Sequence, residues 1–364
     1  MARQPQLYFD NNATAPLRPE AIAAMQAMMG PPANPSSVHG YGRAARMAVE
    51  QARADVAMLT GCRGADIVFT SGGTEANNLA LSVFDHVITS AVEHDSVLRA
   101  ASDATVIGVD SDGRIDLAHL GQVLGDLPDD RRRRTLVSVM YANNETGVIQ
   151  PIDEVVALAR EAGVAVHSDM VQMLGKQHLD FAASGLDYAS LSAHKIGGPT
   201  GVGALLVRPG LRMTSLLRGG GQEQGRRSGT ENVLGIVGFG AAAKSAFDDV
   251  AHFRAMAAWR DRLETRLIKG RNDVRLFGAG VNRIGNTSCL AINEKSAETL
   301  VMAFDLAGAA ISAGSACSSG KVHESHVLKA MNAGEDASRA IRISGGWDTG
   351  ESDFERLAEL VLGL

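Results

Sequence analysis

Short apolar runs rich in β-branched residues alternate with helical stretches along the first two thirds of the chain. At several points between these runs, the apolar positions recur at the spacing of one helix face, most clearly over 151–163. This alternation is typical of a mainly parallel sheet with helices on both faces, so we predict an α/β protein. The predicted strands are 66–70, 86–91, 105–110, 135–141, 164–169, 188–193 and 202–208.

The last two predicted strands are joined by a short, glycine-rich turn. Parallel neighbours need a crossover of a dozen or more residues, usually a helix. We therefore predict that strands 188–193 and 202–208 run antiparallel.

The rhythm of the pattern changes near residue 250. Residues 252–269 form a predicted long amphipathic helix, and a smaller α/β unit follows it. Residues 1–14 do not fit the sheet rhythm, and we expect them to pack near that smaller unit. We predict a large domain over 15–250 and a small domain made of 1–14 and 251–364.

Composition narrows the class of protein. The chain has 364 residues, 45% hydrophobic and 21% charged, as in ordinary soluble globular proteins. Its net charge of −6 argues against a nucleic-acid partner, because its field repels phosphate. No basic stretch followed by an apolar one opens the sequence, and no apolar run reaches the ~20 residues that span a bilayer. We expect a cytoplasmic protein with no membrane partner.

Polar residues or glycines follow five of the predicted strands. Taken singly, each is better explained as a helix cap, a buried hydrogen bond or a solvated side chain. Ligands of open α/β sheets bind beyond the carboxyl ends of the strands, however, and these five ends should meet at one edge. The pattern therefore indicates a shared pocket. Its candidate residues are Gly73, Thr74, His94, Asn144, Asp169, Gln172, Ser192, His194 and Lys195.

The chemistry of these residues limits which ligand the pocket can bind. Glycines before a helix N-terminus, with the hydroxyl of Thr74, suit a phosphate. Lys195 could form a Schiff base, and Asp169 could pair with a protonated ring nitrogen. His94 offers a flat ring for stacking, and Gln172 a donor for a phenolic oxygen. Together they suit pyridoxal 5'-phosphate, which needs a lysine and an acidic partner for its pyridinium nitrogen.

Two other kinds of site fit less well. The segment GFGAAA at 238–243 matches a loose dinucleotide-binding pattern, but it lies inside a helical run and not at a strand-to-helix turn. The cysteines Cys62, Cys289 and Cys317 have no metal-site spacing, so we expect no metal. Cys289 lies in an apolar strand-like run and should be buried. Cys317 lies among small residues, which a structural cysteine would not favour.

Seven segments in a fixed order carry a resemblance to a known family. They are YFDNNATAPL, NPSSVHGYGRAAR, FTSGGTEANNLAL, NNETGVIQPI, LSAHKIGGPTGVGAL, GQEQGRRSGTENV and SAGSACSSG. The chain resembles the NifS-like cysteine desulfurases of the class V aminotransferase family over nearly its whole length. The resemblance implies the type I fold of pyridoxal-phosphate-dependent transferases, with a large domain and a smaller C-terminal one.

The resemblance also implies a role for each candidate. Lys195 would hold the cofactor, Asp169 would pair with its ring nitrogen, His94 would stack on the ring and Gln172 would contact the phenolic oxygen. Asn144 would contact cofactor and substrate, and Arg342 the substrate carboxylate. The implied phosphate ligands are Gly73, Thr74, Ser192 and His194, with Thr230 reaching the phosphate of a second subunit in a homodimer.

The implied reaction converts L-cysteine to L-alanine and leaves a persulfide on Cys317, with His94 assisting proton transfer. The sulfur would pass to an acceptor protein such as an iron–sulfur scaffold. Selenocysteine lyase activity needs the same groups and stays open at this point. A catalytically silent scaffold or sulfur-relay protein of the same fold is the alternative from another class.

Three features depart from the family's usual pattern. Met170 and Met173 stand where small residues are commoner, so we expect different packing beneath the cofactor ring. The loop after Cys317 lacks a frequent proline and carries His323 and His326, which leaves its dynamics open. The chain stops at Leu364, short of the tail that housekeeping relatives use for partner docking, so the acceptor also stays open.

Overall fold

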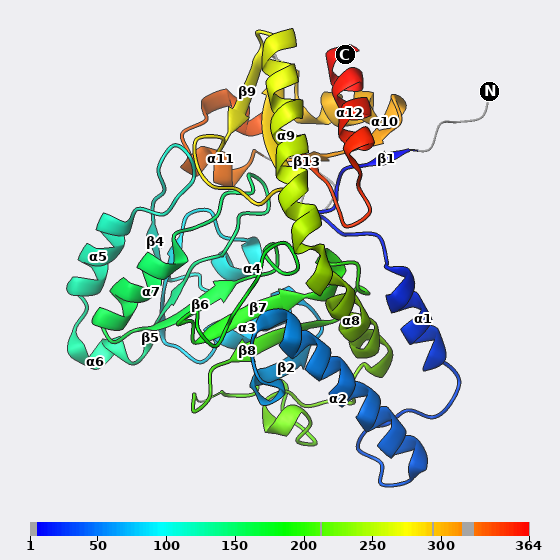
Figure 1. Cartoon of the computed structure of the whole chain (residues 1–364). Coiled ribbons are helices and arrows are strands. Elements are labelled where there is room, and N and C mark those ends of the chain that lie inside the picture. Colours follow the sequence, from blue (N-terminus) through cyan, green and yellow to red (C-terminus); the bar gives the residue numbers. More distant parts are fainter. Residues whose placement is uncertain (1–5, 212, 293–294, 315–323, 364) are drawn as a thin grey trace.

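A computed structural model describes residues 6–211, 213–292, 295–314 and 324–363 of the chain (Figure 1). Its largest element is a seven-stranded sheet in which β8 runs antiparallel to both its neighbours and every other pair is parallel. Both sheet predictions are therefore confirmed. The strands in spatial order are β2 (Ile67–Thr70), β8 (Gly203–Val207), β7 (Tyr188–Ser192), β6 (Ala165–Asp169), β5 (Thr135–Ser138), β3 (His86–Ser90) and β4 (Thr105–Ile107).

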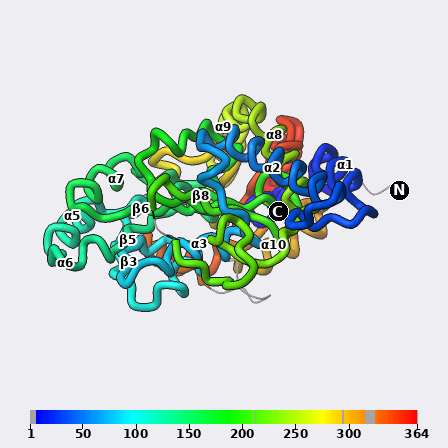
Figure 2. Tube along the Cα trace, turned by 90° about the horizontal axis from the view of Figure 1, so that it is seen from below, coloured from blue at the N-terminus to red at the C-terminus, as the bar shows by residue number. Residues whose placement is uncertain are grey.

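Helices cover both faces of this sheet, and the strand sequences explain why. Side chains alternate between the faces of a strand. Accordingly Phe69 and Leu206 join one core, whereas Val68 and Leu205 join another. The first core receives α1 (Pro19–Ala27), α2 (Gly40–Thr60), α5 (Leu117–Gly125), α7 (Ile152–Glu161) and α8 (Val233–Ala246). The second receives α3 (Gly73–Leu81) and α4 (Asp95–Leu98). Figure 2 shows α1, α2 and α8 grouped beyond one side of the sheet.

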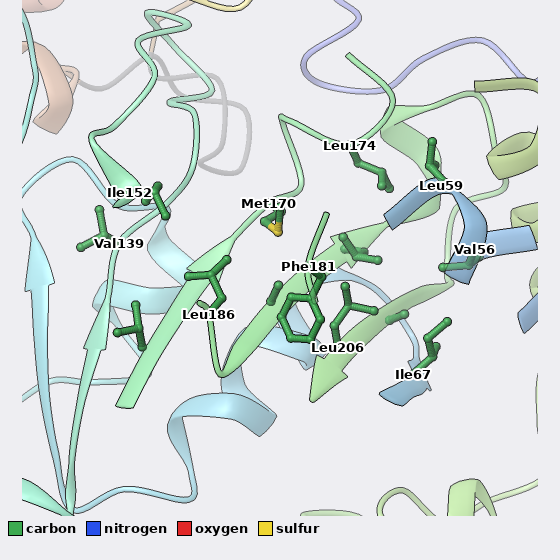
Figure 3. Packing of buried hydrophobic residues seen from close by; sticks show 14 of the residues in the cluster. Val56, Leu59, Ile67, Val139, Ile152, Met170, Leu174, Phe181, Leu186 and Leu206 are labelled. Atoms are coloured by element: carbon green, nitrogen blue, oxygen red, sulfur yellow. The ribbon is translucent and has the colours of Figure 1, made fainter. Parts of the chain in front are cut away.

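The two unusual methionines belong to the core. Met170 lies among Leu174, Phe181 and Leu186 in the larger core, as Figure 3 shows. Met173 is fully buried in a small cluster with Ile284. The 238–243 segment likewise lies within α8, so the strand-to-helix context of a dinucleotide site is missing there.

A further core, separate from the two cores that flank the seven-stranded sheet, is built mainly from the C-terminal residues. We call it the C-terminal unit: α9 (Val250–Gly270) and everything described after it, together with β1 (Leu7–Tyr8). Strand β1 pairs in parallel with β11 (Ala309–Ala310), which brings the N-terminal segment to this unit. The predicted division into 15–250 and 1–14 with 251–364 remains a prediction.

The C-terminal unit has its own antiparallel sheet, which stands above the larger sheet in Figure 1. Its strands in order are β12 (Ser312–Ala313), β13 (Ile341–Ser344), β10 (Thr287–Ile292) and β9 (Val274–Phe277). Its helices after α9 are α10 (Ala297–Leu306), α11 (His326–Ala330) and α12 (Glu351–Gly363). Across the described ranges, no helix has the length and apolarity that a bilayer span requires.

Candidate cofactor site

A cleft of about 190 Å³ opens where β6 and β7 end. The carboxyl ends of these parallel strands deliver Asp169 and Ser192, and the turn after β7 delivers Lys195. Nine predicted residues line this one cleft: Gly73, Thr74, His94, Asn144, Asp169, Gln172, Ser192, His194 and Lys195. The structure thus brings together side chains that are far apart in the sequence.

Glycines allow close packing at two positions, Gly73 in the cleft and Gly203 opposite Ser192 in the sheet. A Cβ at Gly73, the first residue of α3, would lie 2.9 Å from Val171 Cγ2. A Cβ at Gly203 would lie 2.5 Å from the carbonyl oxygen of Leu191. No real Cβ fits so closely, so the strands and the start of α3 can approach each other only with glycine there. The N-terminus of α3, beside Thr74 and Ser192, is consequently open to an anion.

A chain of hydrogen bonds connects the carboxylate of Asp169 to His94. Asn77 Nδ2 donates to Asp169 Oδ2 (2.7 Å) and to Ser96 Oγ (2.8 Å). Ser96 Oγ lies 2.8 Å from His94 Nδ1. The Val171 amide donates to Asp169 Oδ1 (3.0 Å), so both carboxylate oxygens are held. This network orients the acid and the imidazole toward one space.

The amine of Lys195 is held by the N-terminal segment. Its Nζ donates to the carbonyl oxygens of Asn12 (2.5 Å) and Ala13 (2.7 Å). Asn12 also accepts a hydrogen bond from Gln172 Nε2 at the same carbonyl (3.0 Å). One backbone carbonyl therefore sets the positions of two predicted cofactor ligands.

His194 is neutral at ordinary pH. Burial, followed by the charge of Lys195, lowers the pKa of His194 to about 4. Its Nδ1 lies 3.2 Å from Thr14 Oγ1. A neutral imidazole can still donate one hydrogen bond to a phosphate, and it adds no charge beside Lys195.

Arg342 lies outside the group of cleft-lining residues. Its side chain is 1% exposed, and its Nη2 donates to Asp10 Oδ1 (2.6 Å). Its Nη1 donates to the carbonyl oxygen of Asn144 (3.2 Å), next to the cleft. Its Nε is buried with no partner among the residues that the structure describes. A guanidinium with an unused, buried donor can donate a hydrogen bond to a further carboxylate.

One predicted phosphate ligand, Thr230, is not part of this chain's own cleft. Thr230 is exposed on the surface and is not among the cleft-lining residues. Its segment is tied to α3, because Arg227 Nε donates to Glu75 Oε1 (2.9 Å). Cys317 and His323 lie outside the described residues. His326 is described, and its Nε2 donates to the carbonyl oxygen of Glu93 (2.8 Å).

A buried carboxyl lies between the described ends of the segment that contains Cys317. Ser325 Oγ donates to Glu145 Oε2 (2.5 Å), and a Cβ on Gly314 would lie 3.3 Å from that same oxygen. Burial raises the pKa of Glu145 to about 7, against the effects of Ser325 and Arg342. Glu145 directly follows Asn144, which lines the cleft. The two described ends of the segment that contains Cys317 therefore lie near the cleft.

Three residues of the site's surroundings were missed in the sequence: Asn12, Asn77 and Lys176. Asn12 and Asn77 line the cleft, and Lys176 lies buried behind it with its Nζ 2.9 Å from Gln172 Oε1. The YFDNNATAPL segment contains Asn12 and was the available signal for it. Asn77 and Lys176 had no local signal, because helix and turn positions commonly carry exposed amides and lysines.

The donor set fits pyridoxal phosphate. It combines a held amine, a fixed carboxylate, an imidazole and an open helix N-terminus, and pyridoxal phosphate needs a lysine and an acidic partner for its ring nitrogen. Across the described ranges, no group of three His, Cys, Asp or Glu side chains could hold a metal ion. Cys289 is buried as predicted, and Cys62 is half-buried.

The fold and this cleft define a pyridoxal-phosphate-dependent α/β enzyme. Comparison with known families matches residues 7–357 to aminotransferase class-V. The chain belongs to this family.

Individual relatives agree with this assignment. The chain is 40% identical to a cysteine desulfurase of Cereibacter sphaeroides, over 98% of this chain and 95% of that protein. It is similar to the solved structure of a NifS-like protein from Rickettsia africae (TM-score 0.90, 35% identity, 98% of each chain). It is also similar to the structure of SspA in complex with cysteine (TM-score 0.79, 32% identity, 93% of this chain and 98% of that one).

Proposed function

We propose that this chain is a cysteine desulfurase, which removes the sulfur of L-cysteine and releases L-alanine. The observation that carries the proposal is the meeting of Lys195, Asp169 and His94 in one cleft beside the N-terminus of α3. The relatives named cysteine desulfurase match nearly the whole chain and so support the same reaction.

Different residues of the cleft would bind different parts of the cofactor. Bound pyridoxal phosphate supplies an electron sink for the charge left when the substrate's α-proton is removed. Lys195 would hold the cofactor at its aldehyde carbon, and its amine would serve as the base for the substrate's α-proton. Asp169 would pair with the ring nitrogen, and the hydrogen bonds that its two oxygens accept from Asn77 and Val171 fix its position for that contact.

The opposite ends of the cleft hold the two anionic groups. The phosphate would lie at the start of α3 against Thr74, Ser192 and neutral His194. The substrate carboxylate would bind the unused Nε edge of Arg342, beside Asn144. The planar guanidinium suits a carboxylate because it can donate two parallel hydrogen bonds.

Cys317 would receive the sulfur. Its thiolate attacks the substrate sulfur, the substrate's Cβ–S bond breaks and an S–S bond forms. The electron pair of the broken bond passes to Cβ, which takes a proton. L-cysteine and the thiol thus give L-alanine and a persulfide, with no outside oxidant. A thiol of pKa ~8.5 is mostly protonated at neutral pH, so a base is needed, and His94 is our candidate.

The cleft would be completed by a second copy of the chain. Thr230 is exposed and would reach the phosphate in the partner's cleft. The motif NPSSVHGYGRAAR also carries large apolar side chains that are exposed. Val38 is 86% and Tyr41 60% exposed. Apolar surface of this kind is typical of protein interfaces. We therefore propose a homodimer with shared sites.

Native mass spectrometry after incubation with L-cysteine tests these points together. We expect twice the chain mass, one added sulfur atom per chain on the Cys317 peptide, and an equal amount of alanine. Cys317→Ser should keep the cofactor and gain no sulfur. Mixing with an iron–sulfur scaffold protein should remove the added sulfur. A monomer would contradict the shared site, and alanine without added sulfur, or sulfur on another peptide, would contradict the role of Cys317.

A further inference from the structure

A second lysine lies behind the cleft. Lys176 follows β6 by seven residues and is only 5% exposed. Its Nζ donates to Gln172 Oε1 (2.9 Å) and approaches Asn12 Oδ1 (3.5 Å). Among the described residues it has no carboxylate partner, although buried lysines are ordinarily paired.

The energetic cost of burying the Lys176 amine indicates that this residue has a role other than stabilising the fold. Burial, followed by the charges of Lys195 and Arg342, lowers the pKa of Lys176 to about 7. A buried amine with two amide acceptors and two cationic neighbours is less favourable than a methionine of similar length. Stability of the fold therefore does not explain the choice of lysine at this position.

The contacts of Lys176 decide which way round the Gln172 amide lies. An amide group presents an oxygen and an NH₂ that occupy similar space, so either could face the cleft. A protonated amine can donate but cannot accept, so Lys176 in that form holds Oε1 on its own side. The NH₂ group is then directed away, toward the carbonyl oxygen of Asn12 at the rim of the cleft (3.0 Å).

We propose that Lys176 is a positioning residue that makes Gln172 present a hydrogen-bond donor to the phenolic oxygen of the cofactor. The inference rests on the proposed cofactor chemistry and assigns a role to a residue that touches neither cofactor nor substrate. Lys176 and the Asn12 carbonyl hold the Gln172 amide in the same orientation. Without Lys176 one of these two contacts is lost, so the amide turns more easily and its oxygen can then face the phenolic oxygen, where two acceptors repel each other.

Titration of pyridoxal phosphate into the cofactor-free chain tests the proposal. Lys176→Met keeps the length of the side chain and removes its donor. We expect about tenfold weaker cofactor binding and a shifted visible absorbance band, with no loss of stability of the cofactor-free chain in urea. Lys176→Arg, which keeps a donor, should recover part of the affinity. Lys244→Met, which removes an exposed lysine of α8, is the matched control.

A double-mutant cycle shows whether Lys176 affects cofactor binding through Gln172 or independently of it. If Lys176 acts through Gln172, Lys176→Met should change affinity little when Gln172→Ala is already present. Equal affinities of wild type and Lys176→Met, or fully additive effects in the double variant, would overturn this inference alone. So would a loss of stability in the cofactor-free Lys176→Met chain that matches the loss of affinity. Failure of the wild-type chain to bind pyridoxal phosphate would overturn the proposed function as well.

Discussion

The edge of the seven-stranded sheet and the C-terminal unit contribute to the site in different ways. At the sheet edge, Asp169 and Ser192 are the last residues of adjacent strands, and Lys195 follows one turn later. In the C-terminal unit, Arg342 is held by Asp10, 332 positions away in the sequence, and by the Asn144 carbonyl. Asp169 and Ser192 therefore depend on adjacent strands of one sheet, whereas Arg342 depends on contacts between distant segments.

This difference predicts two kinds of variant. Changes at the sheet edge should alter cofactor binding and the visible absorbance first. Changes in the C-terminal unit should alter KM for L-cysteine and leave the cofactor in place. A variant that mixes the two effects would show that the regions are not independent.

Lys195→Ala should have the largest effect. It removes the amine that we propose holds the cofactor and moves the α-proton, so we expect kcat to fall at least about 10³-fold. The visible band of the lysine-bound cofactor should be absent after dialysis, while the circular dichroism spectrum stays that of the wild type. An unchanged absorbance band after dialysis would contradict the assignment of Lys195.

Arg342→Lys should have an intermediate effect. Lysine keeps the charge beside Asp10 but loses the planar fork that binds a carboxylate through two hydrogen bonds. We expect KM for L-cysteine to rise about tenfold to hundredfold, with the cofactor absorbance unchanged. Arg275→Lys, on the exposed side of the same small sheet, is the control. An unchanged KM for Arg342→Lys would place the substrate carboxylate elsewhere.

The sheet edge could be predicted from the sequence because its information is local. Each strand is a short apolar run, and the polar residue that ends it is the residue that enters the cleft, as Asp169 and Ser192 show. Only the bounds of the strands differ from the prediction: the predicted run 105–110 contains a strand over Thr105–Ile107, because Val109 pairs instead with Ile115 across a turn at 111–113.

The surroundings of the site could not be predicted from local pattern, for a physical reason. Asn77 belongs to a helix and Lys176 to a turn, and neither position reveals whether tertiary packing buries it. The approach of Asn12 to Lys195 closes a span of 183 positions, which no periodicity records. Likewise, the sequence did not show that Met170 and Met173 are buried in the core, and the expected difference in packing beneath the cofactor ring stays a prediction.

Glu93→Gln should have the smallest effect on activity and tests how the two regions are joined. The Glu93 carboxyl accepts from the Met140 amide at the sheet edge (2.9 Å), and its backbone carbonyl accepts from His326 of the C-terminal unit (2.8 Å). Burial raises the pKa of Glu93 from 4.5 to about 8, although hydrogen bonds from Ser90 and Met140 oppose this shift. The folded chain therefore keeps this carboxyl protonated at pH values where the unfolded chain has released the proton.

The sign of the pH dependence follows from that raised pKa. The stability that the protonated carboxyl contributes is fully present below pH 4.5 and is lost as the pH rises through about 8. Glutamine keeps an acceptor for Met140 and has no proton to lose. Urea unfolding at pH 5 and at pH 8 should therefore show Glu93→Gln gaining on the wild type at the higher pH, by on the order of 3 kcal/mol. The exposed Glu161→Gln is the matched control and should follow the wild type at both pH values. If Glu93→Gln also follows the wild type, the carboxyl ionises in the folded chain without cost. Glu93 would then contribute to the joint between the sheet edge and the C-terminal unit through its backbone contact with His326 and not through its carboxyl.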